Sequence, residues 1–245
     1  MRVRGVALVL VLWLVAVLAA LAAGLALAAR VEALQVRTLD RGGLARQHAR
    51  AGIEYVVAQL LARPGWAGDG RPLEWRFAGS RVRLQVQDQA GLVDLNQAPP
   101  GLLAELFRGQ GLDAVAAEAL ATRIVQRRSQ RRGRFLAVAE LRALPGMDAA
   151  LYARLRGLLG VHGGALPAAE VAPVAVRMAL RGWSEAGGQA PAAGAVPGSV
   201  YSIDSISMSA AGGRAHVRGV VRLDSAADVG RAYSILGWEE EDSLR

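Results

Sequence analysis

The feature that most constrains this chain is a run of 24 residues without a charge, Val6–Ala29. As a helix with about 1.5 Å rise per residue it spans ~36 Å, and the hydrocarbon core of a bilayer is ~30 Å thick. The apolar region of a cleaved secretory signal has only about 7–15 residues, although Ala26-Leu27-Ala28 is similar to a signal-peptidase site. Arg2 and Arg4 precede the run, and positive charge stays on the cytoplasmic side. We expect one inner-membrane span, with a cytoplasmic N-terminus and the bulk of the chain in the periplasm.

An amphipathic segment follows the apolar run without a proline until Pro64-Gly65, which ends it. Its apolar residues recur at helical spacing, and its arginines lie between them. The apolar members are Leu34, Leu44, Ile53, Val56, Val57, Leu60 and Leu61. We therefore expect one long helix whose membrane part is 6–29 and whose periplasmic part is 30–63.

The first residues of the run, RGVALVLVLWLVAVLAALA, resemble the N-terminus of type IV pilin-like proteins. The resemblance implies that residues 1–5 are a prepilin leader. A prepilin peptidase would cleave after Gly5 and methylate the new N-terminus, Val6. Glycine suits such a site because it allows close approach to the backbone. The apolar helix would then anchor the subunit in the membrane and later pack inside a filament.

Leu10 departs from the pilin pattern, in which the fifth mature residue is usually glutamate. That carboxylate is thought to pair with the N-terminal amine of the neighbouring subunit, since an unpaired charge there is costly. With Leu10 at this position and Trp13 after it, the stretch VALVLVLW resembles the N-terminus of the minor pseudopilin K family of type II secretion systems. The resemblance implies a place at the pseudopilus tip, with other minor pseudopilins and the major pseudopilin as partners, facing the exported protein or the outer-membrane channel. The plainer alternative is one more leucine in a membrane helix.

Alternating apolar and polar residues predict two β-hairpins. The first covers residues 72–89, and the second lies in 199–245, where Gly212-Gly213 joins its strands. A further strand ends near Trp238, and Glu239–Asp242 is interpreted as a solvated tail. Residues 163–198 are expected to be a linker or loop, because 182–198 are rich in Gly, Ala and Pro. The expected class is α+β: a pilin-like fold with a long N-terminal helix packed on an antiparallel sheet.

Residues 91–162 have helical periodicity and are expected to form an inserted all-helical domain between the two hairpins. The segment resembles paired helix-hairpin-helix units, some of which bind DNA through backbone N–H groups. This supports an alternative function, a membrane-anchored DNA-binding protein for DNA uptake. The arginines that would serve it are Arg127, Arg128, Arg131, Arg132 and Arg134. Against it, Asp148 stands where DNA-binding hairpins usually have a glycine, so nucleic acid is the less favoured partner.

The sequence gives no case for an enzyme. It contains no cysteine, and His48, His162 and His216 have no metal-ligand spacing. Asp88, Asp94 and Asn96 cluster near the entry to the helical segment. They carry the oxygen ligands that calcium prefers, and the family resemblance makes calcium a possible cofactor. The alternative is that these three residues are turn and cap residues.

Overall fold

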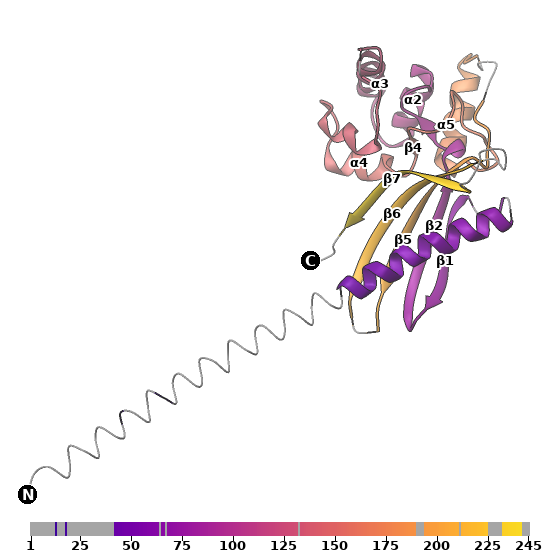
Figure 1. Ribbon diagram of the computed structural model, residues 1–245. Helices are drawn as coiled ribbons and strands as arrows, with labels where there is room; N and C mark the ends of the chain where they lie inside the picture. The colour runs from indigo at the N-terminus through magenta and orange to yellow at the C-terminus, as the bar shows by residue number, and fades with distance from the viewer. Residues whose placement is uncertain are drawn as a thin grey trace, which may run out of the picture.

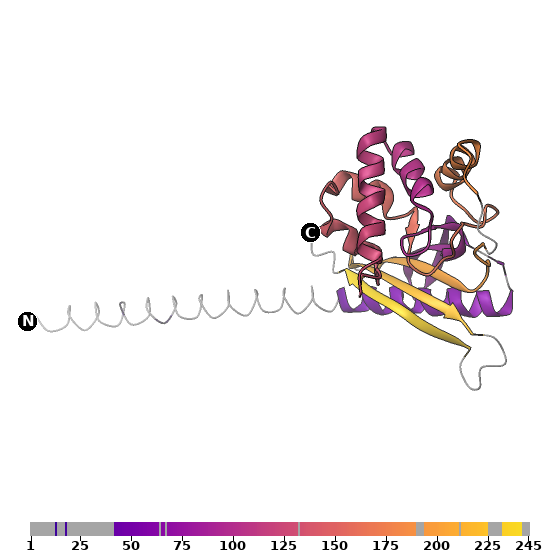
Figure 2. The ribbon, with the colours of Figure 1, turned by 90° about the horizontal axis from the view of Figure 1, so that it is seen from above.

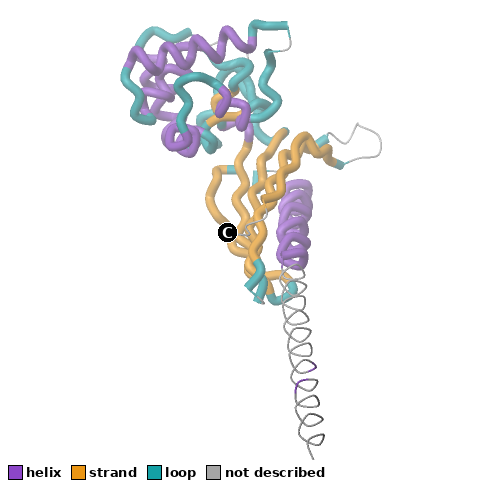
Figure 3. The backbone as a smooth tube through the Cα atoms, turned by 90° about the vertical axis from the view of Figure 1, so that its left-hand side faces the viewer, coloured by secondary structure: helices purple, strands orange, loops and turns teal. Residues whose placement is uncertain are grey.

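The computed structural model describes Trp13, Leu18 and residues 42–63, 65–66, 68–131, 133–189, 194–210, 212–224 and 232–241. Residues 42–62 form a helix along one face of a five-stranded sheet (Figure 1). A group of shorter helices stands at one end of that sheet (Figure 3). The mixture of helices and antiparallel sheet that the sequence predicts is confirmed.

The sheet is antiparallel throughout and has the strand order β1-β2-β5-β6-β7. Its strands are β1 (Asp69–Phe77), β2 (Ser80–Asp88), β5 (Val200–Met208), β6 (Arg214–Leu223) and β7 (Tyr233–Glu241). Burial alternates strictly along most of β2 because successive side chains point to opposite faces. The acidic run predicted to be a solvated tail instead contributes Glu239–Glu241 to β7.

Helix 42–62 lies very close to the sheet because small residues face it. Ala45 and Ala49 are fully buried. At Gly52 an added Cβ would lie 2.5 Å from Ser205 Oγ and 2.8 Å from Leu84 Cδ2. Larger side chains on either side of this approach form the core between helix and sheet; they include Ile53, Val56, Leu60, Val82, Val86, Ile203 and Val217. The face of the helix that carries these small residues therefore packs directly on β2 and β5.

The chain leaves the sheet after β2 and returns at β5, and the intervening residues have their own hydrophobic core. Their helices are α2 (Pro100–Gly109), α3 (Ala114–Arg128), α4 (Ala149–Leu155) and α5 (Val174–Glu185), with 3-10 turns at Gln89–Gly91 and Val138–Ala143. Figure 2 shows α2 and α3 beside each other above the sheet. We call residues 89–185 the helical block.

Two expectations for this part of the chain are wrong. The segment 91–162 is not entirely helical, because β3 (Val93–Asp94) and β4 (Leu159–Gly160) form a small parallel sheet. The segment 163–198 is not only a linker, because it contains α5. Val176 and Ala179 of α5 are buried in the core of the helical block. Glycine-, alanine- and proline-rich flanks hid this short helix from the sequence pattern.

The helical block contains the same turn twice. Gly111 and Gly146 have φ values of +98° and +87°, and each precedes a helix by three residues. Asp113 and Asp148 cap those helices: their carboxylates accept hydrogen bonds from the backbone N–H of Ala116 (2.8 Å) and Leu151 (2.7 Å). The shared Gly-x-Asp pattern therefore supplies a left-handed turn residue and an N-cap at both places.

Candidate functional site

Trp13 is the only one of the four residues with a predicted processing or assembly role that the structure describes. It is helical and 72% exposed. Gly5, Val6 and Leu10 lie outside the described residues, as does nearly all of the apolar run. Within the described parts of the chain, no helix is both long and apolar enough to span a bilayer.

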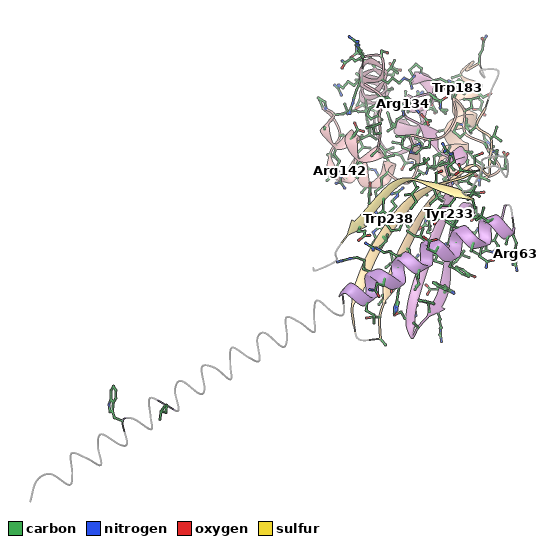
Figure 4. All side chains as sticks on the ribbon, in the orientation of Figure 1. Arg63, Arg134, Arg142, Trp183, Tyr233 and Trp238 are labelled. Carbon is green, nitrogen blue, oxygen red and sulfur yellow. The ribbon has the colours of Figure 1, made fainter. Side chains whose placement is uncertain are left out.

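The last strand, β7, is fastened to helix 42–62 by polar contacts at the rim of their interface. Arg50 Nη2 lies 2.6 Å from Glu240 Oε1, and Arg46 Nε lies 3.7 Å from Glu240 Oε2. Tyr233 donates its hydroxyl proton to Glu54 Oε2 at 2.9 Å. Figure 4 shows Tyr233 and Trp238 on β7, above the helix.

The charge distribution at this rim favours the ionised form of Glu240. The hydrogen bond from the Trp238 indole and the charge of Arg50 hold the pKa of the Glu240 carboxyl below its usual range. The hydrogen bond between Tyr233 and Glu54 raises the pKa of the tyrosine hydroxyl. Strand β7 therefore fixes the helix against the sheet, which the sequence did not indicate.

Asp88 and Asp94 lie at the entry of the helical block and form hydrogen bonds with loops that are far away in the sequence. Asp88 accepts hydrogen bonds from the backbone N–H of Ala90 (2.9 Å) and Gly198 (2.7 Å). Asp94 accepts from Asn96 (2.7 Å), from Gln97 (3.0 Å) and, through its other oxygen, from Gly163 (2.7 Å). Both side chains are buried, and all four of their oxygens accept a backbone proton.

Asn96 binds the backbone of Phe135 in both directions: its amide donates to the carbonyl at 3.0 Å, and its oxygen accepts from the N–H at 2.8 Å. Burial raises the pKa values of Asp88 and Asp94, although their backbone hydrogen bonds oppose that shift. This geometry favours the second interpretation of the trio, turn and cap residues. Within the described parts of the chain, no three His, Asp or Glu residues are grouped in a way that suits a metal ion.

Among the described arginines considered for DNA binding, two make contacts inside the helical block. Arg127 pairs with Glu140 and lies over the Phe135 ring, 4.4 Å from its centroid. Arg128 donates to the Leu95 carbonyl at 3.1 Å. Arg131 and Arg134 are exposed, and Arg132 lies outside the described residues. Two of the five arginines therefore hold the helical block together.

The two Gly-x-Asp turns also differ from phosphate-binding hairpins. The N-terminus of a helix attracts anions through its free N–H groups. At α3 and α4, the carboxylates of Asp113 and Asp148 already accept one of those protons. Each places a negative charge where a phosphate would bind.

A charged cluster that sequence reasoning missed lies where β5 and β6 meet the helical block. Asp204 Oδ1 is 2.9 Å from His216 Nε2, and its Oδ2 is 3.9 Å from Arg218 Nε. Burial pushes the pKa of Asp204 upward, but the hydrogen bond from His216 and the charges of Arg218 and Arg156 outweigh it, so the pKa is lowered. These residues, together with Arg154, line a groove between the sheet and the end of α4. The available sequence signal was the alternation of charged and apolar residues along β6.

No known protein-family model matches this sequence, and no curated protein sequence matches it. A fold similarity does exist, to a chain in the crystal structure of the GspK-GspI-GspJ complex from the enterotoxigenic Escherichia coli Type 2 Secretion System. The two chains are 14% identical, the match covers 85% of this chain and 100% of the other, and the TM-score is 0.60. This chain therefore has a pseudopilin-like fold.

Proposed function

We propose that this chain is a minor pseudopilin of a type II secretion system, placed at the tip of its pseudopilus. The observation that carries the proposal is the architecture, a helix on an antiparallel sheet with a helical block between β2 and β5. It is similar to a chain of a minor-pseudopilin complex over that chain's full length. Minor pseudopilins of the same system are the partners that this similarity supports.

The N-terminal sequence supplies the proposed mechanism. The peptidase would cut after Gly5, and the helix that begins at Val6 would hold the subunit in the inner membrane before assembly. In this role the leucine at position 10 suits a subunit that has no neighbour above it, because a glutamate there would lack its amine partner. Small residues such as Ala16, Ala20 and Gly24 would allow neighbouring helices to approach closely.

The proposed role is mechanical, and two features of the described domain fit it. Helix 42–62 is held from Ala45 to Leu60 by the sheet core and by the contacts of β7, so a force on the helix is transmitted to the sheet. The helical block is held to the sheet through Gln87 of β2, whose side-chain amide donates a hydrogen bond to the Val171 carbonyl at 3.1 Å. The block would then form the top of the tip, toward the outer-membrane channel or the exported protein.

Two substitutions test this proposal in cells that depend on the chain for secretion. Gly5→Ala should block removal of the leader and abolish secretion, because the peptidase requires close approach at that residue. Leu10→Glu should reduce secretion while leaving processing intact, because it places an unpaired carboxylate in the apolar helix. Leu10→Ile serves as the matched control. Normal secretion by both test variants would refute the proposal; normal secretion by Leu10→Glu alone would refute the tip position.

A further inference from the structure

Strand β7 lies at one edge of the sheet, and among the described strands it pairs only with β6 (Figure 2). An edge strand turns half of its backbone N–H and C=O groups away from the sheet, where another strand can bind them. Residues Tyr233–Trp238 of β7 carry no charge. Six residues of a strand span about 20 Å, so this part of the edge is long enough to pair with a short extended segment.

The opposite edge of the sheet, formed by β1, is protected against such pairing. Pro72 has no N–H group to donate, and the exposed side chains of Glu74 and Arg76 are charged. Prolines and charges on an edge strand hinder its pairing with another chain. The stretch Tyr233–Trp238 of β7 contains neither a proline nor a charge. Of the two edges, β7 is therefore the one that can accept a further strand.

One face of the sheet has two exposed apolar side chains beside this edge. Ile235 pairs with the core residue Val221, so it lies on the face toward helix 42–62. Trp238 pairs with Gly219 and lies on the same face, because a Cβ added to Gly219 would contact both Trp238 and the helix. The two side chains are 52% and 37% exposed. A further strand along β7 covers them, and removal of their apolar surface from water favours its binding.

The other face of the sheet has a pocket of about 90 Å³ beside this edge. The register of β6 and β7 leaves Leu236 as an extra residue, a β-bulge. A bulge redirects a side chain, and Leu236 lines the pocket together with apolar residues of the helical block, among them Leu136. Two arginines also line it, but the charges of Arg156 and Arg218 act on Asp204. One water molecule needs only about 10–15 Å³, so the pocket has room for an apolar side chain.

We propose that the edge of β7 and the adjoining pocket bind an extended segment of a partner protein as a further strand of the sheet. The outward backbone groups of β7 select a strand, because a helix uses its own N–H and C=O groups internally. Successive side chains of a strand point to opposite faces. One therefore enters the pocket at Leu236, while its neighbours along the segment cover Ile235 and Trp238, so the segment is apolar on both faces there. The inference goes beyond the proposed function and does not rest on it.

The test uses the full-length protein in an uncharged detergent and a fluorescently labelled peptide with valine and leucine at its centre and threonine at both ends. Two matched peptides of the same sequence carry N-methyl groups, one on the odd-numbered and the other on the even-numbered backbone nitrogens. Each methylation pattern blocks one edge of an extended peptide. Fluorescence anisotropy should show saturable binding of the unmethylated peptide and of one methylated peptide. The other should bind about a hundredfold more weakly, because its hydrogen bonds with β7 are lost.

Variants of the protein locate the site. Leu136 in the pocket and Val115 on α3, which does not line it, are both 79% exposed, so they form a matched pair. Leu136→Asp should weaken binding of the unmethylated peptide by about tenfold, because it places a charge beside the apolar side chain in the pocket. Val115→Asp should change nothing. Ile235→Ser should weaken binding less than Leu136→Asp does, and unchanged thermal unfolding confirms that each variant is folded.

Failure of the unmethylated peptide to bind, or equal affinities of the two methylated peptides, would overturn the proposal, because binding would then not use one backbone edge. So would undiminished binding by Leu136→Asp. Sedimentation that shows a homodimer of the wild type, dissociated by Leu136→Asp, would also overturn it, since a second copy of this chain would then occupy the edge. None of these results depends on leader processing at Gly5, so this proposal and the proposed function fail separately.

Discussion

The two hydrophobic cores of this protein are held in place by opposite means. Helix 42–62 meets the sheet through small residues, and polar contacts with β7 lie only at the rim. The helical block instead depends on buried carboxylates at its entry, those of Asp88 and Asp94, which accept hydrogen bonds from loops that are far away in the sequence. The comparison indicates that the helix–sheet core is sensitive to added volume, whereas the helical block is sensitive to lost hydrogen bonds.

The largest expected effect is that of Asp94→Ala. The substitution removes the buried carboxylate and leaves the half-buried N–H groups of Asn96 and Gly163 without their acceptor, so we expect a loss of about 3 kcal/mol in unfolding free energy. Denaturant unfolding measures this. Asp113→Ala is the control, since loss of a single exposed N-cap should cost about 1 kcal/mol. Equal losses of unfolding free energy in the two variants would show that the buried carboxylate of Asp94 stabilises the protein no more than an exposed N-cap does.

Gly52→Val tests the helix–sheet core. The new side chain would meet Ser205 and Leu84 inside van der Waals distance, so we expect about 2 kcal/mol of destabilisation. Gly43→Ala on the same helix has open space around it and should stabilise the protein by up to about 1 kcal/mol. If thermal unfolding shows that Gly52→Val is harmless, the helix is not seated as closely as described.

Acid should distinguish Asp204, in the groove beside α4, from Asp94, inside the helical block, because the pKa values of these two carboxyl groups are shifted in opposite directions. The lowered pKa of Asp204 means that its contribution is present above pH 3.8 and is lost as the pH falls through its folded-state pKa. The raised pKa of Asp94 works in the other direction, so its burial is least costly below pH 3.8 and becomes more costly as the pH rises through its folded-state pKa.

Asp204→Asn should therefore flatten the decline of stability below about pH 4, and Asp94→Asn should not. Unfolding free energies measured between pH 2 and pH 7 test this. An unchanged acid limb in Asp204→Asn would show that the contacts with His216 and Arg218 do not stabilise the fold.

The smallest expected effect is that of Ser205→Ala. Ser205 Oγ is buried beneath helix 42–62 and makes no hydrogen bond in the structure. Removal of an unpaired buried hydroxyl should leave stability within about 0.5 kcal/mol of the wild type or raise it slightly. A clear loss in the same unfolding assay would reveal a bonding partner for the hydroxyl and would blur the distinction between the two cores.

The local periodicity of the sequence predicted most helices and strands, but it could not predict contacts between residues that are far apart in the chain. The alternation in Arg81–Gln89 predicted the strand now described as β2, and the helical periodicity of 102–128 corresponds to α2 and α3. The placement of Asp88 and Asp94 near the entry was visible in the sequence. Their bonds to Gly198 and Gly163 were not, because those partners are 110 and 69 residues away.

The same limit applies to the rim of the sheet and to α5. Glu240 looked like part of a charged tail because its partners, Arg46 and Arg50, are at the other end of the chain. The helix α5 was missed because its burial depends on a core formed by α2 and its neighbours. Sequence periodicity reports which face of an element is apolar, whereas the identity of the element that covers it is decided by tertiary packing.

The most direct test of the proposed function is the mass and N-terminal sequence of the protein purified from membranes of the cells that make it. The account predicts a chain that begins at Val6 with a methylated amine and retains the whole apolar run. A mature chain that begins after Ala28 would contradict it, because the subunit would then have neither an anchor nor a helix to place inside a filament.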